Sequence, residues 1–164
     1  MTILIPQVKL RSRQISLLYN ERRFDELTNL YTQNAQLILP HAPIMDGSLR
    51  IYNSFATLLE SGADRYTTET SDVKVFDDYA LESGNFMVHD QNSKIVDLGT
   101  YQILWKNING SLFIVRDMAT SISMKLTGNR FTQDESNFIN TFSEMAYSDM
   151  VSTSLKDFKN KNRE

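Results

Sequence analysis

Several features that define common protein classes are missing from this chain of 164 residues. It has no cysteine, which excludes disulfide bonds, thiolate zinc sites and cysteine nucleophiles. Its formal net charge is only -3, too small to give an overall field that attracts nucleic acid or an anionic membrane. No repeat and no Pro- or Gly-rich linker divides it. We therefore expect one globular domain with no nucleic-acid or membrane partner.

Long apolar runs and strong catalytic motifs are missing as well. No apolar stretch approaches the roughly 20 residues that span a bilayer, and the opening run is broken by Pro6, too early for a signal peptide. We expect a cytoplasmic protein, which the lack of cysteine fits. The chain has no helical HExxH, no GxSxG and no phosphate-binding Gly-rich loop. Neither a cofactor nor a metal site is expected.

The strongest positive signal is a hairpin between Asp97 and Ser121. Two runs rich in aromatic and β-branched residues flank Asn109-Gly110, a pair typical of tight hairpin turns. The second arm is apolar at four consecutive positions, Leu112 to Val115, whereas a sheet with one wet face would alternate. We therefore expect both faces of this arm to be covered.

The remaining elements predict an α+β domain. Apolar residues from Val8 to Tyr31 recur at threes and fours around the polar patch 20–23, which indicates two helices or one kinked helix. Ser48 is the expected N-cap of a further helix that ends before Gly62. Strands are expected at residues 35–39, 67–76 and 79–88, besides the hairpin. A four- or five-stranded antiparallel sheet must then curl around the helices, closing a core and leaving a pocket at its open end.

The tail from Gly128 is predicted to be an additional helix. Thr132 and Glu135 form a capping box, and an apolar stripe at helical spacing follows them. The opposite face is not basic, so packing against this fold or a partner subunit is favoured over a membrane. We divide the chain into a cone domain, residues 1–127, and a C-terminal amphipathic helix extension of the same domain, residues 128–164.

Four strings of the sequence occur in a characteristic order, namely NERRFDELTNLYTQNAQLILP, DGSLRIYNSFATLLESG, YALESGNFMV and DLGTYQILWKNINGSLFIVRDMATS. Together they resemble the SnoaL-like branch of the nuclear transport factor 2-like (NTF2-like) superfamily. The resemblance covers about Val8 to Ser121 and implies a curved sheet wrapped on three helices as a cone, with an internal pocket and commonly a homodimer through the outer face of the sheet. The architecture hosts isomerases, dehydratases, hydrolases, cyclases and plain association modules, so it does not fix a function.

The resemblance also argues against one chemistry. In the steroid-isomerase relatives a carboxylate base precedes the proline that ends the first strand, and that position is Leu39 here. The tyrosine that those enzymes use as an oxyanion donor falls near Ile15. Two of the three groups that stabilise a dienolate are thus missing, so ketosteroid isomerase chemistry is rejected and no catalytic residue is assigned.

The polar residues of the expected pocket lie on alternating strand positions. Glu82 shares a strand face with Gly84 and Phe86, and Tyr101 shares one with Trp105. A two-residue turn would pair Tyr101 with Met118 and put Asp117 on the other face. A three-residue loop with Gly110 as a bulge puts Asp117 beside Tyr101, and we favour it because the family pattern makes this position face the pocket.

Two interpretations of these polar residues are open. In one they bind or polarise a small ligand; in the other a buried Asp, Tyr and Glu form a satisfied hydrogen-bond network. The lone His41 at the pocket rim has no second nearby ligand and is not expected to bind metal. The candidate ligand-binding residues are His41, Phe55, Glu82, Tyr101, Trp105 and Asp117.

Three functions are therefore carried forward. The first is a dimeric domain that binds a small apolar or polar organic ligand, the second an enzyme doing acid-base chemistry of the isomerase, dehydratase or cyclase type, and the third an oligomerisation or protein-interaction module. What the pocket contains separates them, because a catalyst needs a carboxylate and a proton donor within reach in a roomy cavity.

Overall fold

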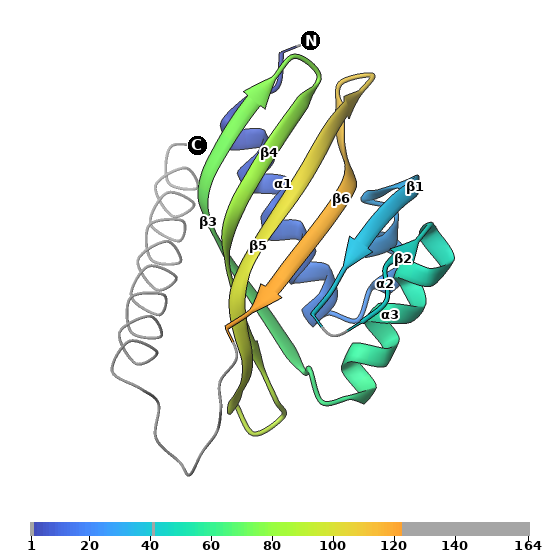
Figure 1. Ribbon diagram of the computed structural model, residues 1–164, viewed down its shortest axis with the longest axis vertical. Coiled ribbons are helices and arrows are strands. Elements are labelled where there is room, and N and C mark those ends of the chain that lie inside the picture. The colour runs from blue at the N-terminus through green and yellow to red at the C-terminus, as the bar shows by residue number, and fades with distance from the viewer. Residues whose placement is uncertain (1, 41, 123–164) are drawn as a thin grey trace, which may run out of the picture. The chain divides into compact units, whose positions relative to one another are not determined.

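A computed structural model describes residues 2–40 and 42–122 (Figure 1). His41 and the expected C-terminal helix lie outside the described residues. None of the described helices has the length and apolar character needed to cross a membrane. The helices are α1 (Ile5–Asn20), α2 (Phe24–Thr28) and α3 (Ser48–Glu60), and the strands are β1 (Tyr31–Ile38), β2 (Met45–Asp46), β3 (Arg65–Phe76), β4 (Tyr79–His89), β5 (Ile95–Ile108) and β6 (Ser111–Ser121).

The polar patch near residue 22 separates two helices. Arg22 adopts a positive φ of 62°, which ends α1, and α2 begins at Phe24. The Arg22 guanidinium donates hydrogen bonds to the backbone oxygen and the carboxylate of Asp64, both at 2.7 Å. Of the two open interpretations, two helices is the one confirmed. The start of α3 differs from the expectation, because Gly47, at a φ of 82°, is the N-cap and Ser48 is the first helical residue.

The α+β class and the curved sheet on N-terminal helices are confirmed, with a difference in strand count and direction. The sheet has six strands in the order β2-β1-β6-β5-β4-β3. All neighbours are antiparallel except β1 and β6, which pair in parallel, so the purely antiparallel sheet was wrong at this place. The sequence missed β2 because a two-residue strand carries no periodic pattern.

The hairpin between β5 and β6 has a two-residue turn, and its bulge lies within β6. The turn has two residues, Asn109 and Gly110, both with positive φ (53° and 88°). The extra residue lies further along β6, since Trp105 pairs with Ile114 but the preceding Leu104 pairs with Arg116. Val115 is therefore the bulge, and the expected bulge at Gly110 was wrong. The expected consequence holds, because Asp117 pairs with Ile103 and shares the inner face with Tyr101.

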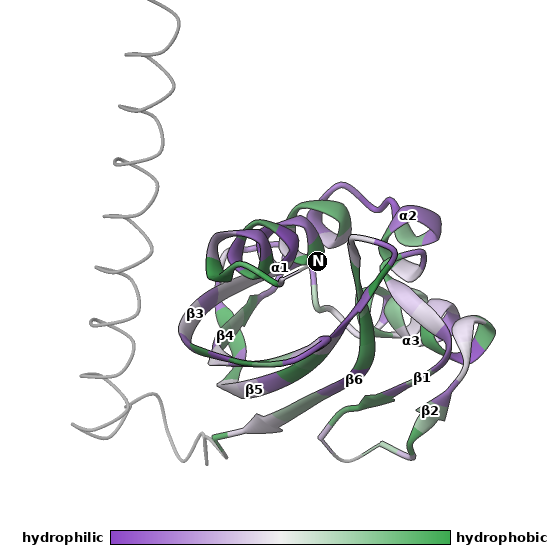
Figure 2. Cartoon of the chain, turned by 90° about the horizontal axis from the view of Figure 1, so that it is seen from above, coloured by the Kyte–Doolittle hydropathy of each residue, from purple (hydrophilic) through white to green (hydrophobic). Residues whose placement is uncertain are grey.

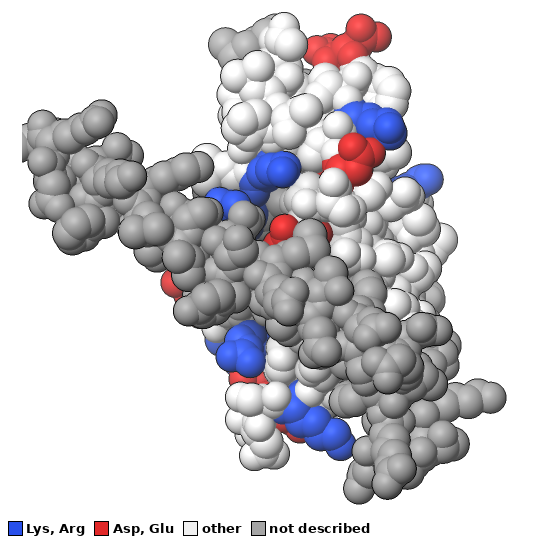
Figure 3. All heavy atoms as spheres, turned by 90° about the vertical axis from the view of Figure 1, so that its left-hand side faces the viewer, with Lys and Arg blue, Asp and Glu red and all other residues white. Residues whose placement is uncertain are grey.

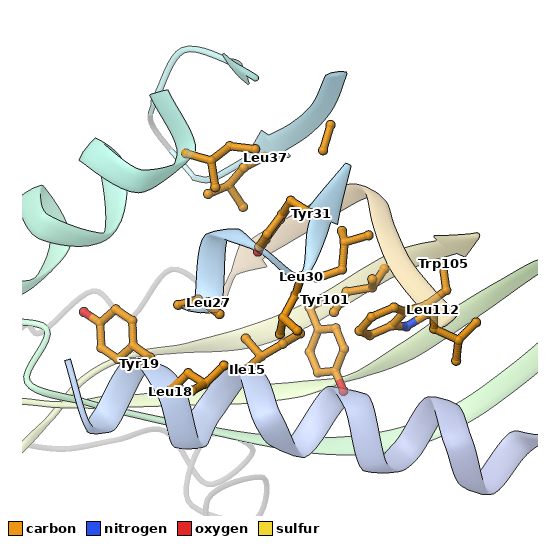
Figure 4. Close-up of a cluster of buried hydrophobic side chains, with 14 of the residues drawn as sticks. Ile15, Leu18, Tyr19, Leu27, Leu30, Tyr31, Leu37, Tyr101, Trp105 and Leu112 are labelled. Carbon is orange, nitrogen blue, oxygen red and sulfur yellow. The ribbon is translucent and has the colours of Figure 1, made fainter. Parts of the chain in front are cut away.

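The helices cover the concave face of the sheet (Figures 1 and 2). α1 turns one face of side chains inward at helical spacing, namely Val8, Ser12, Ile15, Leu18 and Tyr19. They share one core with inward-facing strand residues such as Ile114 and Trp105, which are both fully buried. Figure 4 shows Trp105 with the side chains of α1. The hydrophobic core thus lies between the three helices and the concave face of the sheet.

The apolar arm of β6 divides between the two sides of the sheet. Leu112 and Ile114 point into the core and are 6% and 0% exposed, while Phe113 and Val115 are half-buried. Phe113 alternates with the inward pair and so lies on the outer face. The inner side is covered within the chain, and an Asp substitution at Ile114 would disrupt the core whatever happens on the outer face.

Charged side chains of the described part form exposed pairs of opposite sign. Arg23 bonds both Glu21 and Glu26 at 2.6 Å, and Lys74 lies 3.5 Å from Asp72. On the face seen in Figure 3, the described acidic and basic atoms are interspersed. Exposed pairs contribute about 0–1 kcal/mol each, so the stability of the cone rests on its core.

Two inward-facing glycines permit close contacts inside the cone. A Cβ on Gly84 would lie 2.6 Å from the ring of Tyr101 and would also clash with the backbone oxygen of Glu69. A Cβ on Gly99 would clash with the backbone oxygen of Thr120 and approach Phe86 to 2.9 Å. The missing side chains are what let the sheet curve tightly around the Tyr101 ring.

Gly84→Ala is expected to lower the free energy of unfolding by about 2–3 kcal/mol, because the added methyl must displace a strand backbone or Tyr101. Urea denaturation of the full chain measures this. Ser83→Ala, on the opposite face of the same strand, is the matched control and should change stability by less than about 0.5 kcal/mol. Equal stability of the two variants would contradict the close packing at Gly84.

Candidate functional site

A buried carboxylate with three donors lies in the middle of the sheet. Glu82 on β4 is fully buried. Its Oε1 accepts hydrogen bonds from the hydroxyls of Thr70 at 2.7 Å and Tyr101 at 2.8 Å, and its Oε2 accepts one from Trp105 Nε1 at 2.8 Å. A buried carboxylate is costly unless it is satisfied in this way.

The Glu82 cluster, defined as Glu82 with Thr70, Tyr101 and Trp105, connects three strands and reaches a helix. Tyr101 and Trp105 extend from β5 toward α1 (Figure 4), and the Tyr101 hydroxyl is 3.5 Å from that of Ser12. Burial raises the pKa of Tyr101 far above its ordinary value, and the charge of Glu82 adds to this. Tyr101 therefore stays protonated and keeps donating to Glu82 at neutral pH.

A cavity of about 180 Å³ opens beside the cluster, between the helices and the inner face of the sheet. Its walls are mostly apolar side chains, which include Ile15, Leu37, Leu39, Phe55 and Phe86. The Leu39 and Ile15 positions, where steroid isomerases would have their base and oxyanion donor, both belong to this wall. The cavity wall is thus apolar at those two positions, and its polar groups come from other residues.

Asp117 is the carboxylate in this wall with an unengaged oxygen. Tyr31 donates a hydrogen bond to its Oδ2 at 2.7 Å, and no described residue donates one to Oδ1. Desolvation raises the pKa of Asp117 from 3.8 to about 6, although the Tyr31 hydrogen bond lowers it, and the charge of Glu82 raises it further. Asp117 can therefore exchange its proton close to neutral pH.

Three tyrosines line the same cavity as Asp117 and keep their protons. Burial raises the pKa of Tyr31 and Tyr66 well above 10.0, with the charge of Asp117 adding to both shifts. Burial also raises the pKa of Tyr19 to about 12, and its hydroxyl donates to the backbone oxygen of Ala63 at 2.6 Å. All three are neutral, and of the described residues only Tyr31 donates a hydrogen bond to the Asp117 carboxylate.

A second carboxylate, Asp97, lines another part of the cavity but has both oxygens engaged. Ser121 Oγ donates to Oδ2 and the backbone N–H of Leu98 donates to Oδ1, each at 2.8 Å. The sequence analysis missed Asp97 and Tyr31. Alternation along β5 could have placed Asp97 on the inner face, but Tyr31 meets Asp117 only because β1 and β6 pair in parallel across a long stretch of chain.

The six residues selected from the sequence fall into separate places. Phe55 and Asp117 line the cavity. Glu82, Tyr101 and Trp105 form the closed cluster behind the wall and are not among the residues that line it. The sixth, His41, is outside the described residues. The network interpretation thus fits the cluster, and the ligand interpretation fits the Asp117 side of the cavity.

Histidine and acidic residues give no sign of a metal centre in the described ranges. No group of three or more potential His or carboxylate ligands occurs there. His89 is half-buried, and its Nδ1 has no hydrogen-bond partner among the described residues. Desolvation lowers the pKa of His89, and the nearby Arg65 lowers it further. At neutral pH His89 is therefore a neutral side chain at the end of β4.

Comparisons with known proteins identify the fold. No family model and no curated protein matches the chain. A protein of unknown function with a cystatin-like fold from Nostoc punctiforme is similar at a TM-score of 0.66 and 11% identity, covering 77% of this chain and 98% of its own. A ketosteroid isomerase-like protein from Erwinia carotovora atroseptica (TM-score 0.64, 14% identity, coverage 73% and 96%) and an NTF2-like protein with a cystatin-like fold from Novosphingobium aromaticivorans (0.61, 10%, 77% and 88%) are also similar.

The raised pKa of Asp117 predicts a pH-dependent penalty on folding. Between about pH 4 and pH 6 the folded protein holds a proton that the unfolded chain has lost, so the free energy of unfolding falls as pH rises through this window. Asp117→Asn removes the penalty, keeps an acceptor for Tyr31, and should exceed the wild type in stability by roughly 3 kcal/mol above pH 7 but not at pH 4.

Urea denaturation of the full chain across this pH range measures the difference. Asp72→Asn, at an exposed position of β3, is the control for loss of one negative charge. Its curve should run parallel to that of the wild type, lower by at most about 1 kcal/mol because the exposed pair with Lys74 is lost. A stability difference between wild type and Asp117→Asn that does not vary with pH would contradict the shifted pKa.

Proposed function

We propose that this chain, which has the cystatin-like fold of NTF2-like proteins, is a small-ligand-binding domain whose ligand occupies the cavity beside Asp117. One observation carries the proposal: a mostly apolar cavity is lined by the Asp117 carboxylate, and no described residue donates a hydrogen bond to its Oδ1. Ligand sites are typically apolar with a few placed polar groups. Asp117 supplies such a group, and a ligand can pair with the oxygen that no described residue engages.

The proposed roles of the residues follow from their positions. Phe55 and the aliphatic wall exclude water and contact the apolar body of the ligand, while Asp117 orients it. Glu82, Tyr101 and Trp105 act from behind the wall as a rigid support, because each of their strong hydrogen bonds is already made within the cluster.

A second candidate function is acid-base catalysis, favoured by the pKa of Asp117 at about 6. A general base works best when its pKa is near the ambient pH, and Tyr31 at 2.7 Å supplies a neutral proton donor beside it. Such chemistry would use a carboxylate on β6, since Leu39 occupies the place of the steroid isomerase base.

We also propose a homodimer through the outer face of the sheet. Phe113 and Leu104 lie on this face with Met118, each half-buried, among exposed polar residues such as Gln102 and Thr120. An apolar centre with a polar rim is typical of protein interfaces. A second copy of the same face is a self-complementary partner for it.

Filling the cavity is the test of ligand binding. Ala119→Phe on β6 adds a ring into the cavity that Ala119 lines, so compounds that bind there should be excluded while the chain still folds. Thermal shift with single-ring organic compounds, together with native mass spectrometry for retained molecules, measures binding. Asn53→Phe, exposed on α3, adds the same ring elsewhere and should bind like the wild type. Equal binding by Ala119→Phe would refute the cavity as the site.

Charge on the outer face is the test of the dimer. Phe113→Asp should convert the dimer to a folded monomer, because it puts a charge into the proposed interface and leaves the core intact. Ile114→Asp, one residue away but fully buried, should instead unfold the chain. Sedimentation velocity with circular dichroism separates the two results. A wild-type protein that sediments only as a monomer at micromolar concentration would contradict the dimer proposal.

A further inference from the structure

The charges around the cavity are of one sign among the described residues. Asp117 and Asp97 line it, and no described lysine, arginine or histidine does. Glu82 lies behind the wall, close enough for its charge to act on Asp117. A ligand in this cavity therefore enters a region of negative potential with no countercharge from the described wall.

Hydrogen bonding leaves one clear anchor in the cavity. Asp97 has both oxygens engaged, and Asp117 has Oδ1 without a donor among the described residues. The hydroxyl of Tyr66, which also lines the cavity, is a neutral donor to which an anionic group could bind. A single neutral donor does not offset the repulsion of an anion by the carboxylates beside it.

The size of the cavity limits the ligand. Its volume is about 180 Å³. An apolar protein cavity of roughly 150 Å³ is known to bind benzene. The space beside Asp117 therefore fits a body of about one ring with a short substituent.

We propose that the ligand is a small amine: an apolar body of about one ring with a single basic nitrogen, which binds protonated and donates a hydrogen bond to Oδ1 of Asp117. This inference rests on the proposed ligand-binding function. A protonated amine brings the countercharge that the described wall lacks, and a charge-assisted hydrogen bond is stronger than a neutral one. A hydrocarbon would strip water from Oδ1 without replacing it, and a carboxylic acid would place like charges together.

Binding of the amine should depend on pH through Asp117. The ionised form is required, so affinity should fall as pH drops through about 6. The other titratable groups that face Asp117 from the elements around it are Tyr19 of α1, Tyr31 of β1, Tyr66 of β3, Glu82 of β4 and Asp97 of β5. The tyrosines keep their protons throughout this range because burial raises their pKa values.

Four compounds of nearly the same shape test the inference: benzylamine, benzyl alcohol, toluene and benzoate. Each is titrated into the full chain at about pH 7.5, where the amine and benzoate are both charged. Isothermal calorimetry gives affinity, and NMR shifts of the Phe55 and Tyr31 rings locate the compound. The expected order is benzylamine, then benzyl alcohol, then toluene, with benzoate weakest.

Variants assign the preference to one oxygen atom. Asp117→Asn should weaken benzylamine about tenfold to hundredfold, the range for a hydrogen bond to a charged group, and leave toluene unchanged. Asp72→Asn controls for the loss of one negative charge on the surface and should bind all four compounds like the wild type.

The outcomes separate this inference from the proposed function. Amine preference that is lost only in Asp117→Asn supports both. Toluene or benzoate binding in the cavity as tightly as benzylamine, or an amine affinity unchanged in Asp117→Asn, overturns the amine and leaves the cavity as a ligand site. Failure of all four compounds to shift the Phe55 and Tyr31 rings overturns both.

Discussion

The buried carboxylate of Glu82 is the interaction on which the interior of the cone depends. It takes donors from β3 and, twice, from β5, and it does so from the strand between them. The two hydrogen bonds from β5 each fix a large side chain in one orientation, so the Tyr101 and Trp105 rings have defined positions under α1. Losing the carboxylate would leave several buried donors unsatisfied at once, which is far more costly than losing one exposed ion pair.

Two carboxylates inside the cone, Glu82 and Asp117, differ in how far the protein engages them. Glu82 has its hydrogen-bonding capacity used within the protein, whereas Asp117, on the same concave face, has one oxygen that no described residue engages. The two carboxylates are coupled, since the charge of Glu82 helps to raise the pKa of Asp117. Glu82, which is held within the buried cluster, therefore helps to set the pKa of Asp117 in the cavity wall. The proposed ligand site needs both, one for position and one for contact.

Much of the fold could be predicted from local sequence patterns, because helices, strands and the Asn109-Gly110 turn have local causes. The inner faces of β4 and β5 followed from alternation and were confirmed. The Val115 bulge could not be located, since a run of four apolar residues reads the same with or without an unpaired member. Polar residues of the candidate site were recognised as inward-facing, but alternation cannot tell a closed cluster from an open wall. Only the three-dimensional structure shows that Glu82 belongs to the closed cluster and Asp117 to the cavity wall.

The parallel pairing of β1 with β6 has a consequence for the time order in which the cavity forms. The strands β3 to β6 are joined by short hairpins and can pair as soon as they are made, whereas β1 must wait for the last strand of the sheet. Contacts between residues far apart in the chain carry a high loop-closure entropy and form slowly. The Tyr31 hydroxyl reaches Asp117 across 86 positions of sequence. During synthesis, therefore, the wall around the carboxylate is completed only after β6 has emerged, and until then β1 can pair only with the two-residue strand β2.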